Sequence, residues 1–208
     1  MLLRKSTVEQ FSDILASDAP APGGGSVAAL NGAIAAALIR MVGGLTLGKD
    51  KYMDFHAEML EIMNTAGELQ KKLLFGVDED TEAFNRVSAV FSMPKETQEE
   101  KAARSGAMQT ALKGATITPL ETMKAAKDCL KLANRAFGKT NNSCMSDYGS
   151  AVLCALASAR AAWLNVKINL SGIKDEEFKK QTDIMAREIL AESEALAEDM
   201  YNQIEQSI

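Results

Sequence analysis

The sequence predicts an all-α fold: a multihelical bundle of about five to seven helices, several of them long, around a buried helix rich in alanine and glycine. Only 5% of the 208 residues are aromatic, although 47% are hydrophobic, and this composition suits packed helices better than sheets. From Val27 to Leu45 only Arg40 is charged, so a helix there needs cover on every side, from other helices or from another subunit. No segment shows the alternation that predicts paired strands. Residues 1–208 are expected to form a single domain.

The individual helices follow from apolar periodicity and from the residues that start and stop helices. We expect helices over about 7–17, 26–45, 51–92, 97–137 and 143–170, and from 175 almost to the end. The segment 51–92 forms one long helix or two, with Gly76 as the joint. Thr97 and Glu100 have the spacing of a capping box, and Pro119 predicts a kink in the helix that they start.

The stretch Ala19–Ser26, with the sequence APAPGGGS, precedes the buried helix. Its prolines favour an extended entry, its glycines permit unusual backbone angles, and Ser26 is placed to cap the helix. Free backbone N–H groups at a helix start can bind an anionic or carbonyl-bearing ligand. A flexible connector is the alternative interpretation.

Charge and cysteine content exclude several classes of protein. A net charge of −5 argues against a dedicated nucleic-acid-binding protein. Three cysteines without CxxC spacing indicate neither a disulfide framework nor a zinc site, and we expect no metal. The run Val27–Ile39 is too short and too rich in alanine to span a membrane. Without a signal peptide, the expected compartment is the cytoplasm.

Carboxylates and amides are the candidates for chemistry, because the common nucleophile, phosphate-loop and metalloprotease motifs are absent and the single histidine, His56, suits a surface or packing role. Asp80 falls on the apolar face formed by Val77 and Phe84. Partial desolvation there should raise its pKa and suit it to proton transfer. Acidic residues that favour a helix start are the alternative, and Asp78 lies on a neighbouring face.

A second candidate region extends from Asn141 to Asn169. Helical steps from Asp147 visit small and polar residues and end at Asn165 and Asn169. Such a face could line a cleft that binds a ring with many hydrogen-bonding groups. Close helix–helix packing is the alternative.

Five segments in order resemble the formiminotransferase-cyclodeaminase family, specifically its cyclodeaminase domain and the free-standing bacterial methenyltetrahydrofolate cyclohydrolases. They are APGGGSVAA (21–29), VDEDTEAF (77–84), MPK (93–95) with EEK (99–101), SD (146–147) and NVKINL (165–170). The resemblance extends from about Ser17 to Lys179. It implies a dimeric helical domain that acts on the carbon between N5 and N10 of tetrahydrofolate.

The resemblance also implies roles for particular residues. Asp147 and Asp80, with Asp78 as the next candidate, would transfer protons or stabilise the cationic amidine. The expected substrate-binding residues are Gly23, Gly24, Gly25 and Ser26 through backbone N–H groups, Asn141, Asn165 and Asn169 at the pterin edge, and Lys49, Arg86, Lys95 or Arg104 at the glutamate carboxylates. The folate is expected as substrate, with no permanently bound cofactor. Cyclodeaminase and cyclohydrolase activities both remain open, and a non-catalytic folate-binding or helical assembly protein is the alternative.

Overall fold

The computed structural model describes residues 2–208, which contain six α-helices, three short 3-10 helices and no strand. The α-helices are α1 (Val8–Leu15), α2 (Gly24–Thr46), α3 (His56–Phe91), α4 (Gln98–Ala136), α5 (Met145–Leu170) and α6 (Glu176–Ser207). The 3-10 helices are η1 (Leu3–Lys5), η2 (Asp50–Phe55) and η3 (Asn142–Cys144). The prediction of an all-α multihelical bundle is therefore confirmed.

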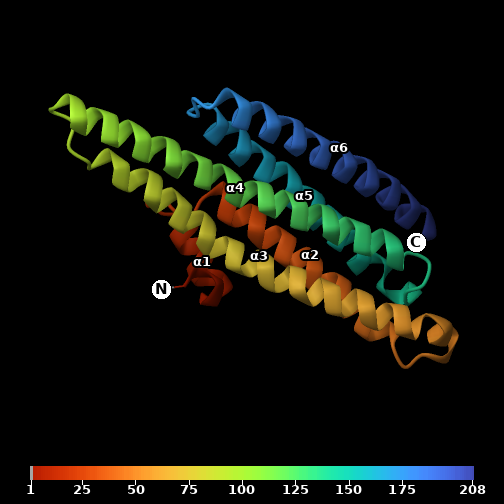
Figure 1. Cartoon of the computed structure of the whole chain (residues 1–208). Coiled ribbons are helices and arrows are strands. Elements are labelled where there is room, and N and C mark those ends of the chain that lie inside the picture. The colour runs from red at the N-terminus through yellow and green to blue at the C-terminus, as the bar shows by residue number, and fades with distance from the viewer. Residues whose placement is uncertain (1) are drawn as a thin grey trace.

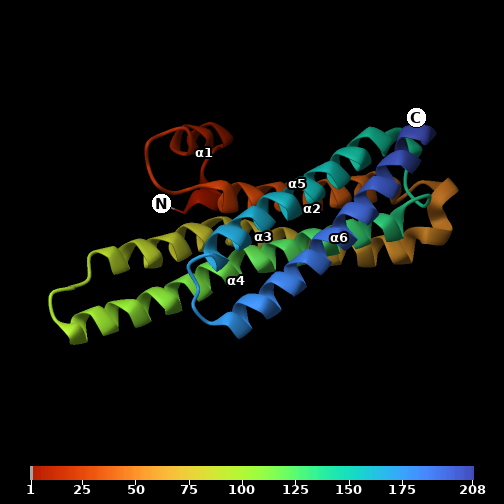
Figure 2. The same ribbon diagram turned by 90° about the horizontal axis from the view of Figure 1, so that it is seen from above.

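The long helices form two layers. α3 and α4 make an antiparallel hairpin in the front layer, α2 and α5 lie behind it, and α6 runs beside α4 and α5 (Figure 1). The connected ends of α3 and α4 project beyond the other helices, and α1 lies outside the α2 layer, near the start of α2 (Figure 2). Of the helices in residues 2–208, this arrangement leaves α1 alone on the outer side of the α2–α5 layer.

Several helix ends follow the sequence, the start and cap of α2 differ from the prediction, and α3 takes the single-helix alternative. Thr97 forms the predicted capping box with Glu100, and Thr7 forms another at the start of α1. α2 begins at Gly24 instead of Ser26, and its N-cap residue Gly23 has no side chain that could cap the helix. Ser26 does not act as a cap, because its hydroxyl binds α3 instead. α3 continues through Gly76, where the missing side chain leaves room for Ala29.

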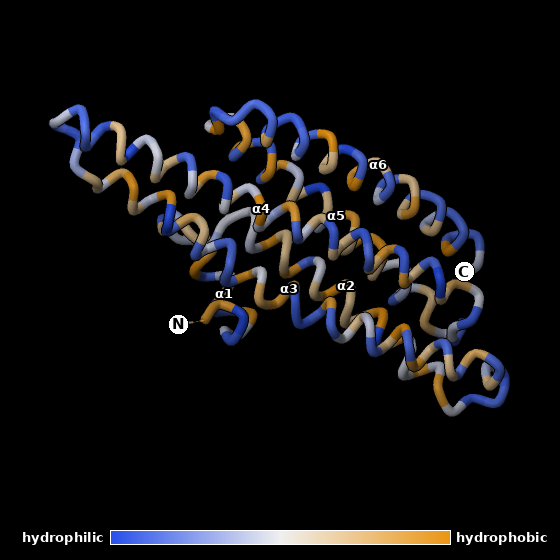
Figure 3. The backbone as a smooth tube through the Cα atoms, viewed as in Figure 1, coloured by the Kyte–Doolittle hydropathy of each residue, from blue (hydrophilic) through white to orange (hydrophobic). Residues whose placement is uncertain are grey.

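The core forms around α2, most of whose alanines are almost fully buried. Ala28, Ala29, Ala35 and Ala36 have no exposed surface, and small side chains let α3 and α5 approach the α2 backbone closely. Within one chain, the other helices cover only part of the circumference of α2. Ile34, Met41 and Leu45 remain 40–47% exposed, in contrast to the largely hydrophilic outer turns of α6 (Figure 3).

Two segments, Gly24–Thr46 and Asn142–Leu170, are long and apolar enough to cross a membrane by length and composition alone. Half of the most apolar window of α2 and 44% of the α5 window are buried against other helices. Core helices of this kind pass the same length and hydropathy test, and the packing observed identifies both as elements of the bundle core.

Candidate active site

A pocket of about 310 Å³ lies where the loop before α2 meets α3, α4 and α5. Its volume is at the lower end of the range for small-molecule sites. It brings together predicted residues from three distant parts of the sequence: the glycine loop, Asp80, and the amides of α5. Its lining consists of Pro20, Ala21, Gly23, Gly24, Gly25, Asp80, Ala83, Phe84, Val87, Ala115, Asn165, Ile168 and Asn169.

Asp80 is held against the first turn of α2. Its Oδ2 lies 3.0 Å from the Ser26 hydroxyl, which also lies 3.0 Å from the carbonyl oxygen of Val77 and 3.3 Å from the hydroxyl of Thr81. A serine hydroxyl donates only one hydrogen. Ser26 can therefore donate to ionised Asp80, or donate to Val77 and accept a hydrogen bond from protonated Asp80.

Burial raises the pKa of Asp80 above its ordinary value of 3.8, while hydrogen bonds from the Ser26 side chain and backbone oppose the rise. The prediction that this carboxyl is desolvated on an apolar helix face is confirmed. No charged side chain other than Asp80 lines the pocket, so desolvation is not offset by an ion pair. A carboxyl with a raised pKa suits reversible proton transfer at pH values closer to neutrality.

Gly25 is required for the close approach of Asp80. A Cβ atom at this position would lie 2.1 Å from Oδ1 of Asp80 and 2.6 Å from its Cγ. Such distances are far inside van der Waals contact. A side chain at position 25 would thus displace the carboxyl group from the helix start.

Both pocket amides are anchored by hydrogen bonds from their NH2 groups. The Asn165 side-chain NH2 donates to the carbonyl of Ala161 at 2.9 Å, and that of Asn169 donates to the carbonyl of Ala115 at 2.8 Å. With a donor of each amide occupied, the side-chain oxygens are available to accept N–H groups of a ligand. Ala115 was missed by sequence reasoning, because its role comes from a carbonyl that faces α5.

Ser26 is buried with no exposed surface and does not line the pocket. Its predicted role as a direct substrate contact is therefore corrected: in this structure the side chain positions Asp80. The apolar wall, with Phe84 and Val87 from α3, includes Ile168, which sequence reasoning did not single out.

Asp78, the third predicted acid, faces away from the pocket. Its Oδ1 accepts a hydrogen bond from the backbone N–H of Leu3 at 2.6 Å, and its Oδ2 pairs with Arg4. Arg4 also stacks over the Phe75 ring, 4.1 Å from its centre. Asp78 is thus occupied in fixing the N-terminal segment to α3, which corrects its assignment as a catalytic candidate.

Other predicted residues lie away from the pocket within one chain. Asp147 is in the first turn of α5, at the opposite end from Asn165. Asn141 is buried near it, where its backbone N–H donates to Thr46 and its side chain to the carbonyl of Leu45. Lys49 follows α2 at the same end and is exposed, and the exposed Arg86 does not line the pocket.

A basic groove, which we define by Lys95, Lys101, Arg104 and Lys174, adjoins the pocket. Its lining includes three residues that lie three or four positions from pocket residues in the sequence. They are Phe91, near Val87 on α3; Leu112, near Ala115 on α4; and Gly172, just after Asn169 at the end of α5. Helical geometry therefore places the groove about one turn further along all three helices. No acidic side chain lines it. Lys101 and Lys174 were not predicted as ligand contacts.

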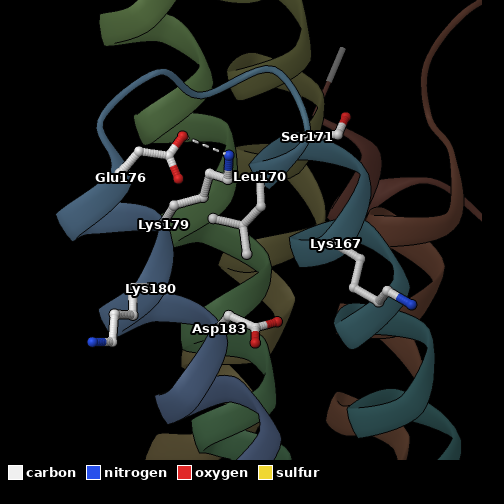
Figure 4. Close-up of a pocket in the computed structure, with 7 residues that line it drawn as sticks. All are labelled: Lys167, Leu170, Ser171, Glu176, Lys179, Lys180 and Asp183. Atoms are coloured by element: carbon white, nitrogen blue, oxygen red, sulfur yellow. Dashed lines mark hydrogen bonds and ion pairs between the residues drawn. The ribbon is translucent and has the colours of Figure 1, made fainter.

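A further pocket, of about 360 Å³, lies between the end of α5 and the start of α6 (Figure 4). Glu176 and Lys179 pair with each other there at 2.9 Å, while Lys167 and Lys180 extend away from one another. It contains none of the predicted site residues. We therefore assign the candidate active site to the Asp80 pocket.

Within residues 2–208, no group of three or more His, Cys, Asp or Glu side chains is arranged to hold a metal ion. The chemistry available is that of a desolvated carboxyl beside amide acceptors and an apolar wall. This combination on a helical bundle is that of an enzyme pocket with a carboxyl group able to transfer protons. Residues 7–188 match the family model described as formiminotransferase-cyclodeaminase, and the chain belongs to this family.

Individual relatives agree with this assignment. The chain is 40% identical over 202 residues to the methenyltetrahydrofolate cyclohydrolase of Methylorubrum extorquens, covering 97% of each chain. It is 33% identical to the formimidoyltransferase-cyclodeaminase of Gallus gallus over 83% of this chain, which amounts to 32% of that longer protein. The crystal structure of formiminotetrahydrofolate cyclodeaminase from Thermotoga maritima has a TM-score of 0.83 and 31% identity, covering 99% of this chain and 96% of that one.

Proposed function

We propose that the protein is a one-carbon folate enzyme that interconverts 5,10-methenyltetrahydrofolate and 10-formyltetrahydrofolate, a cyclohydrolase. The observation that carries the proposal is Asp80, a desolvated carboxyl at the floor of a pocket with amide acceptors. Similarity over 97% of both chains to a protein named methenyltetrahydrofolate cyclohydrolase favours this activity over its alternatives.

In the hydrolytic direction, water adds to the electrophilic carbon between N5 and N10. Ionised Asp80 accepts a proton from this water as the carbon–oxygen bond forms. It then donates that proton to N5 as the bond from the carbon to N5 breaks. The hydroxyl proton leaves as the formyl carbonyl forms on N10, which accounts for the one proton released overall. Ser26 can follow both protonation states of Asp80 by changing its acceptor.

The pocket suits the pterin end of the substrate. The free oxygens of Asn165 and Asn169 would accept hydrogen bonds from N–H groups of the ring, and Phe84 and Ile168 would cover its faces. The p-aminobenzoyl group would then extend toward the basic groove. There Lys95 and Arg104, joined by Lys101 and Lys174, would meet the glutamate carboxylates.

The remaining expectations about partners belong to the same proposal. The exposed apolar residues of α2 support a homodimer, since exposed apolar patches of this kind mark interaction surfaces. We take tetrahydrofolate as a substrate and propose no permanently bound cofactor. The enzyme is proposed to act in the cytoplasm, where folate substrates are available and the three cysteines stay free.

Formiminotetrahydrofolate cyclodeaminase is the second candidate, favoured by the similarity to the Thermotoga maritima structure. The same tetrahedral carbon would form there by attack of N10, with ammonia as the leaving group. Asp80 would then protonate the departing nitrogen. The same pocket residues could serve either reaction, so an assay with each substrate is needed to distinguish the two activities.

The purified chain should be assayed on each substrate separately, with the absorbance of the methenyl compound as the readout. Loss of absorbance from 5,10-methenyltetrahydrofolate above the buffer rate identifies the cyclohydrolase. A gain from 5-formiminotetrahydrofolate with release of ammonia identifies the cyclodeaminase. Folate binding without turnover would instead identify a non-catalytic folate-binding protein and overturn the proposal.

A further inference from the structure

The α5–α6 loop, which comprises residues 171–175 and is visible in Figure 4, connects a residue of the Asp80 pocket to a residue of the basic groove. Asn169, in the last turn of α5, lines the pocket, and Lys174, in the loop, lines the groove. Lys174 follows Asn169 by only five positions. The spacing between an amide of the pocket and a cation of the groove therefore depends on how this loop is held.

Gln109 on α4 holds the loop at its centre. Its side-chain Oε1 accepts a hydrogen bond from the backbone N–H of Lys174 at 2.7 Å, and its Nε2 donates to the carbonyl oxygen of Gly172 at 3.0 Å. A primary amide supplies this acceptor and this donor together, whereas a carboxylate would supply no donor. Gln109 therefore fixes the backbone on both sides of Ile173, whose own side chain is buried in the core.

Two further contacts with α4 hold the chain on each side of this point. Toward α5, the side chain of Asn169 donates to the carbonyl oxygen of Ala115 at 2.8 Å. Toward α6, Asp175 pairs with Lys113 at 2.6 Å. Because these contacts hold the two ends of the stretch, Gln109 controls the course of the backbone between them.

The Lys174 side chain is directed along the groove. Its ammonium group lies 3.3 Å from the hydroxyl of Ser105, which is ten residues before Ala115 and so roughly 15 Å from it along α4. An ammonium group has three donors, so the bond to Ser105 leaves two for a ligand. No acidic side chain lines the groove, and an anionic group such as a carboxylate is therefore the partner that Lys174 suits best.

We propose that Gln109 is a positioning residue that sets the spacing between the Asp80 pocket and Lys174, and that this spacing selects substrates with a carboxylate one aromatic group away from the bound ring. The inference rests on the proposed function, in which the p-aminobenzoyl group joins the pterin to glutamate. Lys174 binds the first carboxylate beyond that group. Loss of the Gln109 hydrogen bonds weakens binding of the tail and leaves Asp80, which is on α3, in place.

Two substrates that differ only in the tail separate tail binding from chemistry. One is 5,10-methenyltetrahydrofolate, and the other is the corresponding pteroyl methylamide, in which a methyl group replaces the glutamate. Gln109→Ala should raise KM for the folate about fivefold, with KM for the methylamide and kcat for both unchanged. Gln203→Ala is the matched control, because this exposed glutamine donates to Asp199 within its own helix, and it should change neither KM. Equal rises in both KM values for Gln109→Ala, or no rise for the folate, would overturn the proposal.

A double-mutant cycle shows whether Gln109 acts through Lys174. Lys174→Ala should raise KM for the folate about tenfold, because it removes a charged partner of the carboxylate. The double variant should show the same rise of about tenfold, since Gln109 then has no cation to position. A rise of about 50-fold, the product of the two single effects, would show that the side chains act independently and would refute the positioning role.

Ligand binding and hydrogen exchange test the inference without turnover. In titration calorimetry, Gln109→Ala should weaken the binding of tetrahydrofolate and not that of tetrahydropteroyl methylamide. The amide proton of Lys174 should exchange at least about tenfold faster in this variant, because its acceptor is gone, and unchanged exchange would contradict the tether. If the wild-type chain converts neither folate substrate while the variant still loses affinity for tetrahydrofolate alone, the proposed function fails and the role of Gln109 stands.

Discussion

Replacing Gly25 with alanine should disable the site while leaving the fold intact. The new Cβ would lie 2.1 Å from Oδ1 of Asp80, and ordinary contact begins at 3.4 Å, so the carboxyl group must move by about 1.3 Å. That movement breaks its 3.0 Å hydrogen bond with Ser26. A displacement of about 1 Å at a reacting group typically costs about 100-fold in rate. We expect kcat to fall by about that factor.

The stability change should be small because two effects oppose each other. Loss of the hydrogen bond to a charged group costs about 1.5–3 kcal/mol, while alanine in place of glycine in a helix gains about 1 kcal/mol. The net loss of about 1 kcal/mol corresponds to a Tm lower by roughly 2–4 °C. Steady-state kinetics and calorimetry provide both values.

Gly106→Ala is the matched control, because Gly106 also lies inside a helix but a Cβ there would meet nothing within 4 Å. This variant should keep wild-type kcat and gain slightly in Tm. Wild-type kcat in Gly25→Ala would show that the position of the Asp80 carboxyl does not limit turnover, and would refute the reasoning.

Three further substitutions test the roles of individual side chains. Ser26→Ala removes a hydrogen bond that lowers the pKa of Asp80, so the acidic limb of the kcat–pH profile should move to higher pH; an unmoved limb would contradict the assignment. Because the pKa of Asp80 is raised in the folded protein, its burial should reduce stability progressively as pH rises above about 3.8, and Asp80→Asn should remove this slope in urea unfolding between pH 4 and 8. Arg4→Ala leaves the buried Asp78 without its cation and should cost about 2 kcal/mol, or roughly 4–8 °C in Tm by calorimetry, with an unchanged Tm as the opposing result.

Sequence periodicity was sufficient for the elements and for the direction of side chains on each helix. The apolar face through Val77 and Phe84 identified Asp80 as desolvated, and burial does raise the pKa of Asp80, although Phe84 is 39% exposed where it lines the open pocket. The same method placed Asp147 and Asn165 on one side of α5. It gives angles around a helix but no information on whether residues five turns apart meet at one site.

Contacts between distant segments could not be predicted from the sequence. Ser26 has the residue type and position of a helix cap, yet its hydroxyl binds Val77 and Asp80, which are 51 and 54 residues away. Asp78 pairs with Arg4 across 74 residues, and nothing in the local pattern distinguishes it from a catalytic acid. Such contacts depend on how the helices dock, which local propensities do not determine.

The start of α2 depends on a carboxyl group that belongs to another helix. Gly23 supplies no side-chain cap, and Asp80 on α3 lies against the first turn in its place. The amide protons of Gly24, Gly25 and Ser26 should therefore exchange with solvent at a rate that depends on α3 docking and on the charge state of Asp80. Amide hydrogen exchange at these three positions would then follow proton uptake at the active site directly, in the absence of any substrate.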